Sequence, residues 1–228
     1  MKVLGVIPAR GGSKGIPNKN IKLLMDIPLI CYTITSSQKS KLLDSLVVTT
    51  DSEKIAQLSK ERGARVPFIR PKNLATDKSE AIPTIQHAVI ETEKIDGLKY
   101  DIVVMLQPTC PFTTPRDIDN AITNIINSGC DSVISVVDVG AHHPFRMKRI
   151  TDKKELIDLI PEAKENTPRQ SLPKIYIRSG DIYAVRRDVL INQNTFKGDK
   201  SMALIIPEER AINIDTYRDW ALAELYKK

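Results

Sequence analysis

The stretch Val3-Leu4-Gly5-Val6-Ile7 is apolar, and it leads directly into Pro8-Ala9-Arg10-Gly11-Gly12-Ser13-Lys14-Gly15-Ile16-Pro17-Asn18-Lys19-Asn20. This pattern predicts a buried strand that ends in a glycine-rich loop with three cations, Arg10, Lys14 and Lys19. Glycines allow backbone N–H groups to close on an anion, and the cations match the charge of a polyphosphate. Because ligands of open α/β sheets bind at the carboxyl ends of the strands, the loop predicts a site for a nucleoside triphosphate.

The spacing of this loop excludes two common phosphate-binding motifs. A Walker loop ends in Gly-Lys-Ser/Thr at the start of a helix, whereas here Lys14 precedes Gly15 and Pro17 follows. The dinucleotide motif Gly-x-Gly-x-x-Gly does not fit the glycines of this loop either. The alternative is a flexible basic surface loop. The apolar run before the loop, and the arginine at its end, favour the anion site.

Composition narrows the class of protein. At 228 residues and 41% hydrophobic, the chain suits one large domain, residues 1–228, with a sizeable core. No apolar run approaches the roughly 18 residues of a membrane span, and the start lacks a signal-peptide pattern, so we expect no membrane association. Three scattered cysteines, Cys31, Cys110 and Cys130, indicate reduced thiols and a cytoplasmic location.

The charge balance favours a small anionic ligand over nucleic acid. The net charge is +6, but the basic residues are scattered, and only 5% of residues are aromatic, which is poor for stacking bases. A polyphosphate and an acidic sugar fit this balance.

Strand-like and helix-like segments alternate along the chain. They predict an α/β fold with a mostly parallel, Rossmann-like sheet and helices on both faces. The stretch His142–Ile177 interrupts the alternation and predicts an insertion that leaves the sheet and returns. The expected strands are Lys2–Ile7, Ser45–Thr50, Ala64–Phe68, Asp101–Leu106, Ser132–Val137, Asp181–Val185 and Met202–Ile206. The expected helices are Leu29–Ser40, Ser52–Arg62, Ala81–Ile95, Arg116–Ser128 and Tyr217–Tyr226.

Three polar loops follow expected strands. They are Arg70-Pro71, Leu74-Ala75-Thr76-Asp77-Lys78-Ser79 and Leu106-Gln107-Pro108-Thr109-Cys110-Pro111-Phe112. Each alone is compatible with an ordinary connection. Because all three meet the glycine-rich loop at one sheet edge, together they predict a cleft.

These segments resemble one enzyme family. Residues 7–20 closely resemble the signature of the acylneuraminate cytidylyltransferases, the CMP-sialic acid synthetases. The three polar loops are similar to the family's Arg-Pro, Leu-Ala-x-Asp-x-Ser and Leu-Gln-Pro-Thr-Ser-Pro, in the same order, with Cys110 in place of serine. The resemblance implies an enzyme that couples CTP to a nine-carbon 2-keto acid sugar and releases pyrophosphate. The Ser-Thr-Arg-Leu-Pro loop of the related octulosonate synthetases is absent.

The resemblance assigns roles to individual positions. Arg10 and Lys19 would neutralise phosphate charge as pyrophosphate leaves, and with Asp215 they are the expected catalytic residues. Either Arg70 or Asn20 would contact the cytosine edge. The expected nucleotide-binding residues are Arg10, Gly11, Gly12, Ser13, Lys19, Asn20, Arg70, Asp77 and Ser79. The expected acceptor-binding residues are Gln107, Thr109, Arg169, Gln170, Arg178 and Asp181.

The insertion also resembles a family segment. His142-His143-Pro144 and Pro168-Arg169-Gln170-Ser171-Leu172-Pro173 are similar to parts of an arm that dimerises and completes the partner's sugar site. The resemblance therefore implies a homodimer, with Arg169 pairing with the sugar carboxylate. Two adjacent histidines without a third ligand make a weak zinc site, so a structural or interface role is expected for them.

Two positions depart from the family pattern. Asp181, within Ile177-Arg178-Ser179-Gly180-Asp181-Ile182-Tyr183, stands where the family usually has a small residue. The family's Asp-Ile-Asp metal motif is Asn213-Ile214-Asp215 here. In a strand both side chains would point to one side, so Asp215 and, more weakly, Asn213 are the expected ligands of Mg²⁺.

Two alternatives remain open at this point. One is a CMP-octulosonate synthetase, for Kdo or amino-Kdo, with the same chemistry and a shorter sugar. The other is a catalytically silent CTP-binding regulator, which only Asn213 favours. Within the nine-carbon class, the acceptor is of sialic, legionaminic or pseudaminic type.

Overall fold

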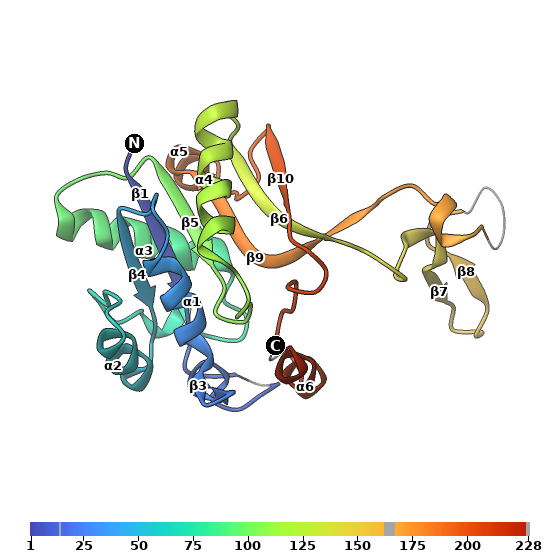
Figure 1. Ribbon diagram of the computed structural model, residues 1–228, viewed down its shortest axis with the longest axis horizontal. Helices are drawn as coiled ribbons and strands as arrows, with labels where there is room; N and C mark the ends of the chain where they lie inside the picture. The colour runs from blue at the N-terminus through green and yellow to red at the C-terminus, as the bar shows by residue number, and fades with distance from the viewer. Residues whose placement is uncertain (14, 162–166, 227–228) are drawn as a thin grey trace.

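The computed structural model describes residues 1–13, 15–161 and 167–226. Its centre is one six-stranded sheet in the order β10-β6-β9-β5-β1-β4, in which β9 alone runs antiparallel to its neighbours (Figure 1). The expected α/β class with a mostly parallel sheet is confirmed. The strands are β1 (Val3–Pro8), β4 (Ser45–Thr49), β5 (Ile102–Leu106), β6 (Ser132–Asp138), β9 (Tyr176–Arg186) and β10 (Ser201–Ile205).

Helices cover both faces of this sheet (Figure 1). Side chains alternate along each strand, so that in β1 Val3 and Ile7 enter one apolar cluster while Leu4 and Val6 enter the other. The first cluster includes α1 (Leu29–Gln38), α2 (Glu53–Glu61) and α4 (Pro115–Ser128). The second includes α3 (Ala81–Asp96) and α5 (Arg187–Asn192).

A third apolar cluster lies beneath the glycine-rich loop. It joins the N-terminal part of the chain, including the hairpin of β2 (Leu23–Leu24) and β3 (Ile27–Pro28), to α6 (Tyr217–Leu225). Because burial of one large apolar side chain contributes about 1.5–3 kcal/mol, this cluster holds the C-terminal segment firmly against the loop. Its buried members are Ile16, Leu24, Leu29, Ile212, Ile214, Trp220 and Ala223.

Two helices begin as the sequence predicts. Ser52 caps α2, because its side chain accepts a hydrogen bond from Ile55 N. Thr114 and Asp117 form a reciprocal capping box at the start of α4, with Pro115 in the first turn.

Two expectations about the sheet need correction, and one helix was not expected. Ala64–Phe68 forms no strand, only an isolated bridge between Arg65 and Val47, because Pro67 lacks the N–H that would continue the ladder. The strand expected at Asp181–Val185 is β9, which begins already at Tyr176. Helix α5 follows β9 directly and was not predicted from its short, mixed sequence.

The insertion leaves the sheet where β6 ends and returns on β9. Asp138 of β6 still pairs with Tyr176, so the excursion lies between them. Within it, β7 (Lys148–Ile150) and β8 (Leu156–Asp158) form a hairpin that stands away from the sheet (Figure 1). Within the described residues, no helix combines the length and apolarity needed to cross a membrane.

Candidate active site

A cavity of about 340 Å³ opens at the carboxyl ends of β1 and β5. Its walls come from the loop after β1, the segment before α3, the loop after β5 and the segment before α6. This is the edge at which the strand-end loops predicted a cleft. The cavity brings together these expected site residues: Arg10, Gly12, Ser13, Lys19, Asn20, Arg70, Asp77, Ser79, Gln107, Thr109 and Asp215.

The glycine-rich loop presents Arg10 to this cleft. Arg10 Nη1 donates to Asp77 Oδ1 at 2.7 Å, which ties the loop to the segment before α3. Asn20 Nδ2 donates to the Arg10 carbonyl at 3.0 Å, whereas the buried Asn20 Oδ1 has no hydrogen-bond partner among the described residues. Asn20 lines the cleft with this acceptor still unused. Lys14, the third expected cation, lies outside the described residues.

Lys19 meets the C-terminal segment across the cleft. Its Nζ donates to Asp215 Oδ1 and to the Ile214 carbonyl, each at 2.8 Å. The loop passes so close to this segment that a Cβ on Gly15 would lie 2.5 Å from the Asp215 carbonyl oxygen. Glycine is therefore required at position 15.

Arg70 is the most buried cation of the cleft. Its guanidinium donates to the carbonyl and hydroxyl of Thr49 and to the Leu74 carbonyl. Burial lowers the pKa of Arg70 to about 10, although nearby Asp51 opposes the shift. In the described structure neutral oxygens, and no carboxylate, accept these hydrogen bonds.

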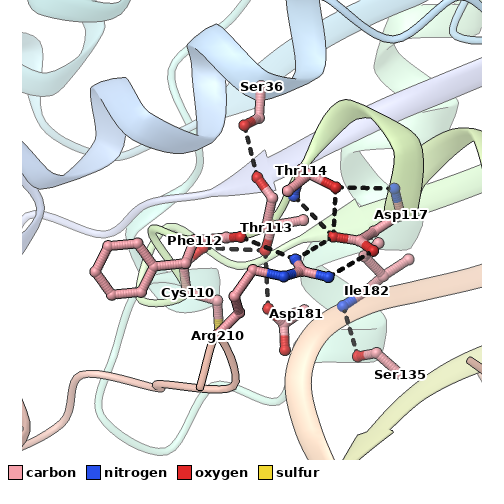
Figure 2. Close-up of polar contacts among 10 residues, drawn as sticks. All are labelled: Ser36, Cys110, Phe112, Thr113, Thr114, Asp117, Ser135, Asp181, Ile182 and Arg210. Carbon is pink, nitrogen blue, oxygen red and sulfur yellow. Dashed lines mark hydrogen bonds and ion pairs between the residues drawn. The ribbon is translucent and has the colours of Figure 1, made fainter. Parts of the chain in front are cut away.

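Polar contacts hold the loop after β5 from three sides (Figure 2). Ser36 of α1 donates to the Thr113 carbonyl at 2.6 Å, and Thr113 Oγ1 lies 2.9 Å from Asp181 Oδ1. Arg210 bonds both oxygens of Asp117 and the Phe112 carbonyl. These contacts fix the loop that carries Gln107 and Thr109 into the cleft.

Comparison with known proteins identifies the family. Residues 4–219 match the protein family described as Cytidylyltransferase. The chain belongs to this cytidylyltransferase family. The resemblance seen in the loops is thereby confirmed, and the chain is a nucleotidyltransferase of the CMP-sugar synthetase type.

Three comparisons show which known proteins this cytidylyltransferase resembles. It is 35% identical to the CMP-N,N'-diacetyllegionaminic acid synthase of Legionella pneumophila, covering 98% of this chain and 95% of the relative. It is 32% identical to the N-acylneuraminate cytidylyltransferase of Escherichia coli O18:K1:H7, covering 97% of this chain and 51% of that longer protein. The fold matches a solved CMP:2-keto-3-deoxy-manno-octonic acid synthetase complexed with CTP, with a TM-score of 0.73 at 17% identity over 99% of this chain and 98% of that one.

Several expected site residues of the cytidylyltransferase lie outside the cleft of their own chain. Gly11 does not line it, and its amide donates to Asp51 Oδ1 at 2.8 Å. Arg169 and Gln170 line a second cavity of about 270 Å³ at the base of the insertion. Arg178 is exposed on β9. Asp181 is buried behind the loop after β5.

The expected metal pair is not arranged as a strand. Residues 211–215 form no regular element, so the argument that Asn213 and Asp215 point to one side fails. Asp215 lines the cleft, whereas the Asn213 side chain packs beside Gly180 and its Oδ1 is buried without a partner in the described structure. Mg²⁺ binding by either residue stays a prediction.

The two histidines of the insertion have different surroundings. His143 is buried; its Nδ1 accepts from Phe145 N at 3.2 Å and its Nε2 lies 3.2 Å from the Pro173 carbonyl. The contact with Pro173 links the two halves of the insertion, which agrees with the expected structural role. His142 is exposed.

Sequence reasoning missed the residues that support the cleft from behind. Asp51 holds the glycine-rich loop through Gly11, and it lies two residues after the end of β4, a strand-end position that marked other site residues. Arg210 and Asp117 carried no such signal, because 93 positions separate them.

Proposed function

We propose that this protein is a CMP-nonulosonate synthetase, which couples CTP to a nine-carbon 2-keto acid sugar and releases pyrophosphate. One observation carries the proposal: Arg10 and Lys19 of the glycine-rich loop and Arg70, from a distant part of the chain, line one cleft. The relatives of about one-third identity, named for legionaminic and neuraminic acids, support the nine-carbon class.

The triphosphate would bind between the glycine-rich loop and the segment before α3. Arg10 and Lys19 are each paired with a carboxylate in the free protein, with Asp77 and Asp215 respectively. A phosphate carries more charge than a carboxylate, so it would compete for both cations. Ser13 and the open backbone at Gly12 would add neutral contacts, and Asn20 Oδ1 would accept an N–H of the nucleoside.

In this proposal the chemistry is a direct phosphoryl-group substitution. The anomeric hydroxyl of the sugar attacks the α-phosphorus of CTP, and the bond to the bridging oxygen of pyrophosphate breaks. The sugar hydroxyl loses its proton to water or to a nearby base. Positioning and charge neutralisation by Arg10 and Lys19 then supply most of the rate enhancement, because the reaction needs no covalent enzyme intermediate.

The residues at the cleft fit a magnesium ion carried with the nucleotide. The described residues contain no group of three or more His, Cys, Asp or Glu side chains suited to a metal, so a cage made of protein alone is not available there. Mg²⁺ commonly uses one or two carboxylates plus phosphates and water. Asp215 opens onto the cleft and would be that carboxylate. The ion would supply charge neutralisation to the triphosphate.

The sugar site in this proposal is completed by a second subunit. Gln107 and Thr109 line the cleft, whereas Arg169 and Gln170 lie on the insertion of the same chain, in another cavity. A two-fold homodimer would bring one insertion to the other cleft. Exposed apolar side chains on the β7–β8 hairpin support this arrangement, since Ile150 is 72% exposed and Leu156 67%.

A reaction panel tests the proposal. Purified protein is incubated with Mg²⁺, each of the four nucleoside triphosphates, and eight- or nine-carbon 2-keto acid sugars, and pyrophosphate is measured. We expect release only with CTP and a nine-carbon acid. Turnover of octulosonates alone would identify the shorter-chain synthetase, and tight CTP binding without turnover on any sugar would identify a silent regulator.

A further inference from the structure

The β9 strand bulges where it passes the loop after β5. The ladder between β6 and β9 loses its register between Ile134 and Val136, and Gly180 adopts a φ of +95° there. Ser135 Oγ accepts the displaced amide of Ile182 at 2.8 Å, so the bulge is a defined feature (Figure 2). It places the side chain of Asp181, which is 1% exposed, against Thr113.

The hydrogen-bond distances around Thr113 bear on the protonation state of Asp181. Thr113 Oγ1 lies 3.0 Å from the Cys110 carbonyl and 2.9 Å from Asp181 Oδ1. A hydroxyl has one hydrogen to donate, and both of these oxygens are acceptors if Asp181 is ionised. A protonated Asp181 resolves the conflict, because its O–H donates to Thr113 while Thr113 donates to Cys110.

The charges nearby favour the same state. Arg210 is engaged by Asp117, with distances of 2.6 and 3.1 Å, and Asp181 Oδ2 has no partner in the described structure. Burial raises the pKa of Asp181 and outweighs the opposing hydrogen bonds from Ser179 and Thr113, and the charge of Asp117 raises it further. The other titratable groups that interact with Asp181 are Cys110 on the loop, whose pKa is itself raised by burial, and Tyr183 on β9.

We propose that Asp181 is a neutral carboxylic acid in the folded protein at neutral pH, and that its proton orders the loop after β5 through Thr113. The two carboxyl groups near the loop thus differ in charge: Asp117 is ionised and paired with Arg210, and Asp181 is not. Asp181 is a positioning residue, because it acts on Gln107 and Thr109 only through the loop backbone. The expected effect of the loop on sugar binding rests on the proposed function, whereas the protonation state of Asp181 does not.

Infrared difference spectroscopy tests the protonation state directly. The wild-type protein at pH 7 should show the C=O stretch of a protonated carboxylic acid, and Asp181→Asn should lack it. Thr113→Val should shift this band, whereas Thr113→Ser, which keeps the hydroxyl, should leave it in place. If the Asp181→Asn variant fails to fold, the difference in the position of the C=O band between the two Thr113 variants still reports on Asp181. Absence of the band in wild type would overturn the proposal.

The pH dependence of unfolding gives a second test. If Asp181 is protonated when folded and ionised when unfolded, the wild-type unfolding constant rises relative to Asp181→Asn by roughly tenfold per pH unit above the ordinary carboxyl pKa. Below that pKa the ratio of the two unfolding constants should no longer change with pH. A difference that does not change with pH would contradict the proposal.

The KM values for the sugar and for CTP test whether the loop after β5 acts in the reaction. Thr113→Val should raise KM for the sugar several-fold with little change in KM for CTP, and Thr113→Ser should restore the wild-type ratio. A loss of kcat alone, with both KM values unchanged, would show a merely structural role. Because spectroscopy needs no turnover, failure of the proposed function would leave the infrared result standing.

Discussion

Lys19 Nζ lies 2.8 Å from Asp215 Oδ1, although 196 positions separate the two residues. The contact joins the glycine-rich loop after β1 to the segment before α6, and Lys19 also bonds the Ile214 carbonyl. The apolar cluster of Ile16, Ile212 and Ile214 lies beneath it. The expected phosphate-binding loop and the expected metal ligand are therefore held together by contacts between the N-terminal and C-terminal parts of the chain.

Asp215 is expected to be the principal protein ligand of Mg²⁺. A carboxylate supplies the hard anionic oxygen that this ion prefers. Asp215→Ala should abolish pyrophosphate release, and added Mg²⁺ should restore little of it. CTP binding measured by calorimetry without metal serves as the control, and it should persist. Full activity of the variant at ordinary Mg²⁺ would remove Asp215 from the proposed mechanism.

Asn213→Asp tests whether the neighbouring position reaches the metal. If it does, the restored carboxylate should lower the Mg²⁺ concentration for half-maximal rate, without necessarily raising the maximal rate. The Asn213 side chain packs beside Gly180, with Oδ1 buried, so a carboxylate held there would instead destabilise the fold. An unchanged Mg²⁺ titration would limit the metal site to Asp215.

Arg10→Ala should collapse turnover while leaving the fold intact. Loss of one preorganised charge contact to a reacting phosphate typically lowers the rate by roughly a hundredfold or more. The matched control is Arg62→Ala, which removes an exposed arginine that does not line the cleft. Near-normal activity of Arg10→Ala at subsaturating CTP would refute the phosphate assignment.

The exposed hairpin predicts a homodimer. Ile150 and Leu156 face each other in the β7–β8 ladder and are both largely exposed. Changing both to glutamate should give monomers by light scattering, because charge at an apolar interface is costly. These monomers should bind CTP but fail to use the sugar. Ile95→Glu, on the exposed face of α3, should leave assembly unchanged. A monodisperse, fully active wild-type monomer would exclude the shared sugar site.

Asp117 should stabilise the fold in a pH-dependent way. Burial raises the pKa of Asp117, but the Arg210 and Thr114 hydrogen bonds outweigh this effect and hold it below the usual range. The stabilisation is therefore present above the ordinary carboxyl pKa and is lost as pH falls through the lowered folded value. In urea titrations Asp117→Asn should cost about 2 kcal/mol at pH 7 and much less at pH 3. An equal cost at both pH values would contradict the ion-pair account.

The strand-end loops were predictable from sequence because their signal is local. Glycines, cations and prolines directly after apolar runs identified Arg10, Lys19 and Gln107 as residues of one cleft, and the structure brings them together. The regular alternation of strand-like and helix-like segments likewise predicted the α/β fold and its mostly parallel sheet. The contacts behind the cleft, such as Arg210 with Asp117, depend on tertiary packing between distant segments, and no local pattern encodes them.

The errors have physical causes of the same kind. Pro67 ends a potential strand that hydrophobicity alone favours, and the bulge at Gly180 places Asp181 behind the loop after β5. The assumption that Asn213 and Asp215 lie two apart on a strand failed because residues 211–215 form no regular strand. They pack instead against the glycine-rich loop, in the cluster that contains Ile16, Ile212 and Ile214.

The most direct test of the central claim is the product itself. Wild-type protein, CTP, Mg²⁺ and a nine-carbon 2-keto acid sugar should yield the CMP-sugar, detected by mass spectrometry, with one pyrophosphate released per product. Legionaminic, neuraminic and pseudaminic acids, compared at equal concentration, should be turned over at different rates. At least one of them should be turned over faster than every eight-carbon acid. Formation of no CMP-sugar from any nine-carbon acid, with CTP bound and the protein folded and dimeric, would contradict the account.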